Sequence, residues 1–182
     1  MNDGPSGPLL VDLVLAGAWI SGLTNRVENR RRLVDVLNGE GELLDLEEAT
    51  VNYDRDRHPR SYHTLSVDKS SIVVAIPRET QEQTRRRALL TSTVGRSATV
   101  QTPVAILIPP FRIEGMAHLT PGSGKVRPDP SVFSRFFPLT IARIELEDGS
   151  FHEASVALVN RDAIVAMSLL SDGLPYERQK SA

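Results

Sequence analysis

Two stretches of the sequence, LVDLVLAGAWISGL at residues 10–23 and PVAILIPPFRIEGM at residues 103–116, align with each other without a gap. Both contain an Ile-x-Gly-apolar step at the same place, so that Ile20 aligns with Ile113 and Gly22 with Gly115. Self-similarity at a fixed offset is typical of a chain built from repeated structural units. The sequence therefore predicts two copies of one unit.

Two further pairs of blocks extend the repeat. Residues 46–51 match residues 139–144, and residues 67–73 match residues 159–165 after a one-residue slip. The blocks agree in order and spacing, so an organisation of the whole chain follows. We expect a disordered N-terminus at 1–8, a first repeat at 9–77, a partly helical linker at 78–102, a second repeat at 103–170 and a flexible tail at 171–182.

Each copy has the pattern of short strands, because apolar runs alternate with turn residues. A helical segment is expected between the second and third strands, at 31–37 in the first copy and at 131–137 in the second. The predicted fold is mainly β with short helices (α+β). It consists of two tandem small five-stranded β-barrel-like repeats, each with a helix inserted between strands two and three. The sequence leaves open whether the barrels are separate or fused into one sheet.

The composition excludes several classes of protein. The 182 residues carry 21 Lys and Arg against 23 Asp and Glu, and they include no Cys. A disulfide scaffold is therefore excluded, and so is a protein that binds nucleic acid over its whole surface. No apolar run approaches the roughly 20 residues of a spanning helix, and the N-terminus has no basic leader. We expect a cytoplasmic protein of bacterial type without a membrane partner.

The expected strands, with Ile-x-Gly at residues 20–22 and the last hairpin at residues 159–165, resemble the Sm-like family of small β-barrels. The resemblance implies RNA binding, with Lys69, Asn160 and Arg161 in the hairpin turn that faces RNA. The family's Asp-x-x-Met-Asn loop before the third strand is absent here, and neither hairpin has the family's Arg-Gly step. The chain also resembles, more faintly, uncharacterised bacterial small domains, a likeness that implies no activity.

A run of basic residues marks a further candidate nucleic-acid site. Arg85, Arg86 and Arg87 are adjacent and could contact phosphates. The few aromatic residues are not interleaved with Lys or Arg, which a stacking site for single strands would require. A solvated charged surface is therefore the favoured interpretation of the run, and a nucleic-acid site is the alternative.

Two arginines fit part of a ligand-binding pattern. Arg26 and Arg30 match the Arg-x-x-x-Arg half of the PilZ pattern, and this resemblance implies that paired guanidiniums bind the phosphates of cyclic di-GMP. The second half of the pattern is incomplete at residues 68–73, because Val73 stands in place of Gly.

Motifs of enzymes and metal sites do not emerge from the sequence. The four histidines have no Cys or carboxylate at a zinc-binding spacing. Residues 119–126 depart from a phosphate-binding loop at its first Gly and at its Ser/Thr position. We therefore expect no enzyme, no metal and no cofactor.

The leading hypothesis is a non-enzymatic binding or scaffold module of unknown partner. Its sheet edges would accept a protein partner or a second copy of the chain by strand addition. The alternative is an RNA-binding protein resembling Sm-like proteins. A nucleotide second-messenger sensor is the third and least supported hypothesis.

Overall fold

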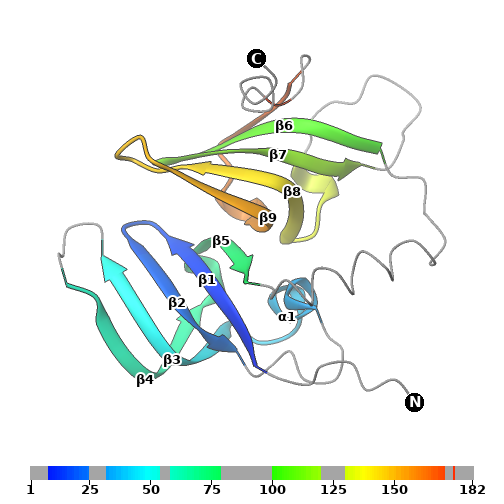
Figure 1. Cartoon of the computed structure of the whole chain (residues 1–182). Coiled ribbons are helices and arrows are strands. Elements are labelled where there is room, and N and C mark those ends of the chain that lie inside the picture. Colours follow the sequence, from blue (N-terminus) through cyan, green and yellow to red (C-terminus); the bar gives the residue numbers. More distant parts are fainter. Residues whose placement is uncertain are drawn as a thin grey trace. The chain divides into compact units, whose positions relative to one another are not determined.

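The structure is a computed structural model that describes residues 8–24, 32–53, 58–78, 100–119, 130–170 and 174. The chain divides into two compact units, Met1–Gly95 and Arg96–Ala182, and Figure 1 shows the elements of each. Most of the expected N-terminal segment, linker and tail lies outside the described residues.

The first unit is an antiparallel sheet with the strand order β5-β1-β2-β3-β4. Its short helix precedes β3, and a single turn of 3-10 helix joins β4 to β5. The elements are β1 (Leu9–Leu15), β2 (Ala18–Thr24), α1 (Leu33–Asn38), β3 (Leu43–Tyr53), β4 (Arg60–Asp68), η2 (Lys69–Ser71) and β5 (Ile72–Pro77).

The second unit has the corresponding order β10-β6-β7-β8-β9, also antiparallel. A 3-10 turn again joins its fourth and fifth strands. The elements are β6 (Val100–Ile108), β7 (Phe111–Leu119), η3 (Pro130–Val132), β8 (Phe136–Glu145), β9 (Phe151–Asn160), η4 (Arg161–Ala163) and β10 (Ala166–Leu169).

Local sequence explains the tight turns within these sheets. β1 and β2 are joined at Gly17, whose φ of 90° lies in a region that glycine enters without steric cost. β6 and β7 are joined through Pro109 and Pro110, which share a cis peptide bond. The β8–β9 hairpin turns at Gly149 with a φ of 79°. A compact turn at residues 147–150 therefore joins these two strands.

Aliphatic side chains form the core of each unit. In the first unit, Leu13, Leu44 and Ile72 are fully buried, and in the second, Ile113 and Leu139 are. β5 is buried from Ile72 through Ile76, as expected of a short continuous apolar run. Each such side chain contributes about 1.5–3 kcal/mol when it leaves water.

A β-bulge bends the first unit at Gly22. The pairing of β2 with β3 shifts register between Ser21 and Leu23, and Glu48 on β3 has a φ of 47°. A Cβ on Gly22 would lie 3.1 Å from the Cβ of Leu46. The close approach explains why this position of the Ile-x-Gly step has no side chain.

The same bulge occurs in the second unit at Gly115. The pairing of β7 with β8 shifts between Glu114 and Met116, and Ile141 has a φ of 52°. A Cβ on Gly115 would lie 3.2 Å from the Cβ of Leu139. The two aligned glycines therefore occupy the same local geometry.

The expectation of two barrel-like repeats is wrong, because the described strands form open antiparallel sheet. Within the first unit β4 and β5 stand at opposite ends of the strand order, and no pairing between them closes it. β4 buries only Val67, which is too little apolar surface to close a barrel. Alternating apolar residues indicate a strand with one buried face, but they do not distinguish an open sheet from a closed one.

The expectation of a helix between strands two and three in each repeat is also wrong. The first unit has α1 there, whereas the described residues of the second have only the three-residue η3. Phe136 and Phe137 already belong to β8 and are buried, and the ring of Phe133 stacks on that of Phe137 with centroids 4.2 Å apart. Because Phe136 and Phe137 pair and pack as part of β8, residues 131–137 do not form the expected helix.

Candidate interaction surface

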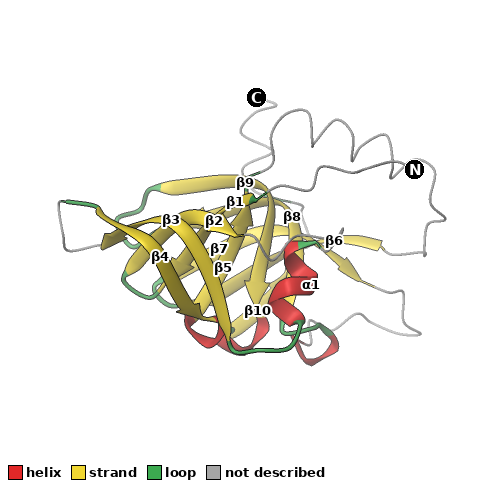
Figure 2. Cartoon of the chain, turned by 90° about the horizontal axis from the view of Figure 1, so that it is seen from below, coloured by secondary structure: helices red, strands yellow, loops and turns green. Residues whose placement is uncertain are grey.

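β4 is the edge strand of the first unit. It pairs with β3 from Leu43 opposite Asp68 to Val51 opposite Arg60, and no other strand in the described ranges pairs with it. Figures 1 and 2 show β4 at the outer side of this sheet with β3 as its neighbour. An edge strand presents a row of backbone N–H and C=O groups to its surroundings.

β4 lacks two of the features by which proteins usually protect an edge, short length and proline. It is nine residues long and contains no proline, whereas β10, the end strand of the second unit, has only four residues. Short edge strands, prolines and inward-pointing charges normally prevent the pairing of an edge with another chain. β4 is therefore the better candidate for strand addition.

The solvent face of the β3–β4 pair is acidic. Asp45 and Glu47 are two residues apart on β3, so both point away from the core, and Leu44 and Leu46 point into it. Glu48 adds a third exposed carboxylate, because the bulge at its positive φ turns it out of the alternation. Ala49 and Val51 then return to the core.

Short polar side chains of β4 lie beside these carboxylates. Ser66 pairs with Asp45 in the register, and its hydroxyl donates to Asp45 Oδ1 at 2.7 Å. Thr64 lies opposite Glu47. His63 Nδ1 lies 2.6 Å from Glu48 Oε1, and both side chains are mainly exposed. The acidic face, defined as Asp45, Glu47, Glu48 and Asp68, thus borders the open edge of β4.

Lys69, one of the residues expected to face RNA, is 1% exposed. Its ammonium donates to the carbonyl oxygens of Val36 at 2.8 Å, Gly39 at 3.2 Å and Glu40 at 3.5 Å. These carbonyls end helix α1, where a cation is favoured by the helix dipole. The charge of Lys69 therefore holds α1 against the start of β5.

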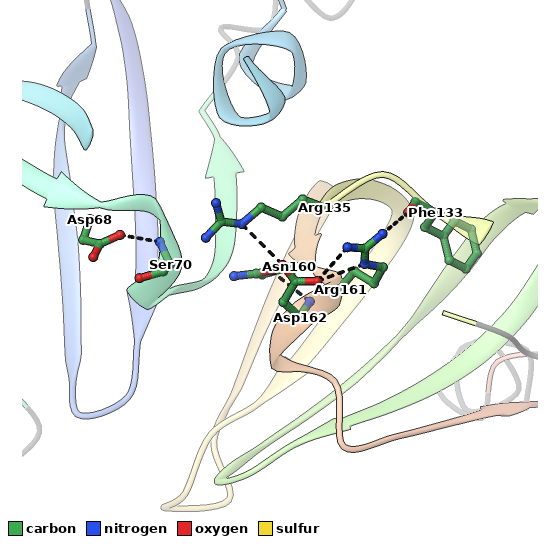
Figure 3. Close-up of polar contacts among 7 residues, drawn as sticks. All are labelled: Asp68, Ser70, Phe133, Arg135, Asn160, Arg161 and Asp162. Carbon is green, nitrogen blue, oxygen red and sulfur yellow. Dashed lines mark hydrogen bonds and ion pairs between the residues drawn. The ribbon is translucent and has the colours of Figure 1, made fainter. Parts of the chain in front are cut away.

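Asn160 and Asp68 cap the N-termini of the two 3-10 turns, as Figure 3 shows. The side chain of Asn160, which is 1% exposed, accepts from the backbone N–H of Asp162 at 3.0 Å. Asp68 accepts from the N–H of Ser70 at 2.7 Å. Such caps satisfy the first N–H groups of a turn. Asn160 is thus an N-cap whose amide is buried.

Arg161 is more accessible, but it also has partners within its unit (Figure 3). One guanidinium nitrogen donates to the carbonyl oxygen of Phe133 at 2.9 Å, and another lies 2.8 Å from Asp162 Oδ1. Arg135 Nε lies 3.6 Å from the other oxygen of Asp162. Two guanidiniums therefore share one carboxylate. RNA binding by Lys69, Asn160 and Arg161 stays a prediction, and only Arg161 has a side chain that is one-third exposed.

Five further candidates lie outside the described residues: Arg26, Arg30, Arg85, Arg86 and Arg87. Most of the loop compared with a phosphate-binding loop also lies outside them. The two ligand hypotheses built on these arginines therefore stay predictions. Among the residues that the structure does describe, no three His, Asp or Glu side chains come together as metal ligands.

Each unit also buries a carboxylate that the sequence did not single out. Asp12 of β1 is completely buried, accepts from Ser21 at 2.6 Å and forms an ion pair with Arg78. In the second unit Glu114 pairs with Arg112 at 2.7 Å. Because a buried carboxylate that loses its partner is costly, these ion pairs hold the two acids in place within their own units.

The alternation of residues in β3 is the feature of the sequence that points to the acidic face. In the run Leu44 to Glu47, apolar and acidic residues alternate, which is typical of a strand with one buried and one solvent face. That β4 ends the sheet could not be inferred from one strand's pattern.

Comparisons with known proteins leave the family open. No family model, no curated protein and no solved structure matches the chain. Within the described part of the chain, no helix has the length and apolar character that crossing a membrane requires.

Proposed function

We propose that the chain is a non-enzymatic protein-binding module that accepts an extended segment along the open edge of β4. The observation that carries the proposal is the length of this edge, nine residues without proline and with β3 as its one partner among the described strands. In strand addition, main-chain hydrogen bonds supply affinity, and alternate side chains supply specificity.

The surroundings of β4 favour a protein over a nucleic acid as the partner. Phosphates would meet the carboxylates of Asp45, Glu47 and Glu48, which repel them. Lys69, the cation expected to bind RNA in this unit, is buried against three carbonyl oxygens. RNA binding is therefore retained only as an outcome of the test.

Proline substitutions in β4 test the proposal. Backbone N–H groups of successive strand residues point in opposite directions, so proline at His63 or Thr64 removes one N–H facing β3 and one facing outward. Both side chains are exposed, so neither change empties the core. Loss of the N–H that faces β3 removes a hydrogen bond of the sheet and lowers the unfolding midpoint, whereas loss of the outward N–H does not. The variant that keeps the parent's unfolding midpoint is therefore the one whose outer edge is blocked.

Binding is then measured with extended peptides selected from a displayed library on the parent protein. We expect the edge-blocked variant to lose binding of the selected peptides, and the peptides to protect amides of residues 60–68 from hydrogen exchange. Sedimentation over a concentration series reports whether a second copy of the chain occupies the same edge. Selected peptides that bind the blocked variant unchanged would overturn the proposal, as would salt-sensitive binding of RNA in place of any peptide.

A further inference from the structure

We propose that the segment accepted along β4 is a basic extended peptide with Lys or Arg at alternate positions. This inference rests on the proposed strand addition and specifies its ligand. It starts from the charge of the solvent face beside the edge. Asp45, Glu47 and Glu48 are exposed there, and Asp68 is exposed at the end of β4.

Three described basic residues of the first unit have partners outside the acidic face, and a fourth, Arg60, lies at the start of β4 with its guanidinium 5.7 Å from the ring centroid of Tyr53. Lys69 is buried and donates to carbonyl oxygens at the end of α1, and Arg78 forms an ion pair with Asp12. Arg32 pairs with Asp35 at the start of α1. Among the described residues of β3 and β4, the four carboxylates of the acidic face outnumber the one arginine, Arg60, and this excess of negative charge favours a basic ligand.

The register brings the carboxylates within reach of an added strand. Neighbouring strands lie about 4.8 Å apart, so a strand added beside β4 is about 10 Å from β3. The β4 residues between them, Thr64 opposite Glu47 and Ser66 opposite Asp45, have short side chains. Long side chains of the added strand can extend over these two residues and reach the carboxylates of β3.

The spacing of the carboxylates sets the pattern of the peptide. Thr64, Ser66 and Asp68 are alternate residues on the solvent face, and their partners across the ladder are Glu47, Asp45 and Leu43. Side chains of an added strand that point to the same face recur at every second residue. Two alternate cations would face Glu47 and Asp45, and a third would face Asp68 directly.

The probe is a fluorescent peptide of nine residues that alternates Lys with Val and Thr, assayed by anisotropy against the full chain. Two control peptides separate charge from strand formation. The first replaces every Lys with Glu, and the second keeps every Lys but places Pro at the other positions, where it prevents pairing. We expect binding of the first probe only, weakened by added salt.

Charge variants of the protein test the carboxylates. The double variant Asp45→Asn/Glu47→Gln should weaken binding of the Lys peptide roughly tenfold, because each exposed ion pair contributes a factor of about 2–5. Glu147→Gln, at the exposed turn between β8 and β9 of the second unit, is the matched control and should leave the affinity unchanged. Unfolding midpoints confirm that all variants are folded.

The two proposals fail in distinguishable ways. If library-selected peptides protect residues 60–68 but bind the Asp45→Asn/Glu47→Gln variant as tightly as the parent, the basic-peptide inference is overturned and strand addition stands. If the Lys peptide with interspersed prolines binds as well as the strand-forming one, the acidic face attracts any polycation and the inference is likewise overturned. If blocking the edge changes no peptide's affinity, both proposals fail.

Discussion

Replacing the buried Lys69 by methionine should destabilise the first unit without affecting its open edge. The ammonium donates to Val36 at 2.8 Å in a buried position and more weakly, at 3.2 and 3.5 Å, to Gly39 and Glu40. Both weaker acceptors belong to exposed residues, so water can replace the lost donor there. The Val36 carbonyl has no such replacement.

The magnitude follows from this one buried bond. A hydrogen bond to a charged group contributes about 1.5–3 kcal/mol, and loss of a cation at a helix C-terminus adds a few tenths of a kcal/mol. Methionine keeps most of the apolar contact of the lysine stem, so we expect Lys69→Met to lower the free energy of unfolding by about 2–3 kcal/mol.

Urea unfolding followed by fluorescence measures this loss selectively. The chain has one tryptophan, Trp19, and it lies in β2 of the first unit. Arg60→Met is the matched control, because Arg60 is exposed at the start of β4. Its guanidinium lies 5.7 Å from the ring centroid of Tyr53, an exposed contact whose loss should lower the free energy of unfolding by no more than about 1 kcal/mol. If Lys69→Met has the same urea midpoint as the parent and loses affinity for RNA, the ammonium contacts phosphate and our interpretation is refuted.

The remaining predictions concern four other positions. Gly22→Ala should destabilise by about 1–3 kcal/mol in thermal unfolding, because its Cβ would lie 3.1 Å from that of Leu46 and 3.3 Å from the Cα of Ala49; a parent-like melting temperature would contradict the close approach. Gly149→Ala meets no atom within 4 Å and should lose only about 1 kcal/mol for its positive φ. Asp12→Asn should cost about 1–3 kcal/mol, because it breaks the ion pair of a buried carboxylate with Arg78, itself half-exposed; an unchanged urea midpoint would show that the pair contributes nothing. The Ser150 hydroxyl and backbone N–H lower the pKa of Asp148, so Ser150→Ala should raise that pKa in an NMR titration. Because the pKa of Asp148 is lower in the folded state than in the unfolded state, this carboxylate favours folding at pH values above its unfolded-state pKa. The contribution is lost as the pH falls through the folded-state pKa.

The sequence predicted the strands well where periodicity and turn residues coincide. The matched blocks at residues 46–51 and 139–144 lie within β3 and β8. The aligned Ile-x-Gly steps place Gly22 and Gly115 at equivalent positions, and the structure shows each glycine at a bulge where the neighbouring strand approaches closely. Local patterns suffice for these features because the decisive contacts are with adjacent strands.

Closure and side-chain direction could not be predicted from the same patterns. Whether β4 closes on β5 depends on how much apolar surface both strands offer together, and β4 buries Val67 alone. The direction of Lys69 depends on carbonyls of α1, an element 30 residues earlier in the chain. A lysine in a hairpin turn is ordinarily exposed, so only the three-dimensional contacts reveal that this one is structural.

Hydrogen exchange at β4, with and without the peptide that alternates Lys with Val and Thr, tests the central claim most directly. Our account predicts that the peptide slows exchange of every second amide between residues 60 and 68 in the parent, that it does not do so in the edge-blocked proline variant, and that the Asp45→Asn/Glu47→Gln variant needs a roughly tenfold higher peptide concentration for the same protection. Protection confined to other parts of the chain, or unchanged exchange at saturating peptide, would contradict the claim that this edge accepts a basic strand.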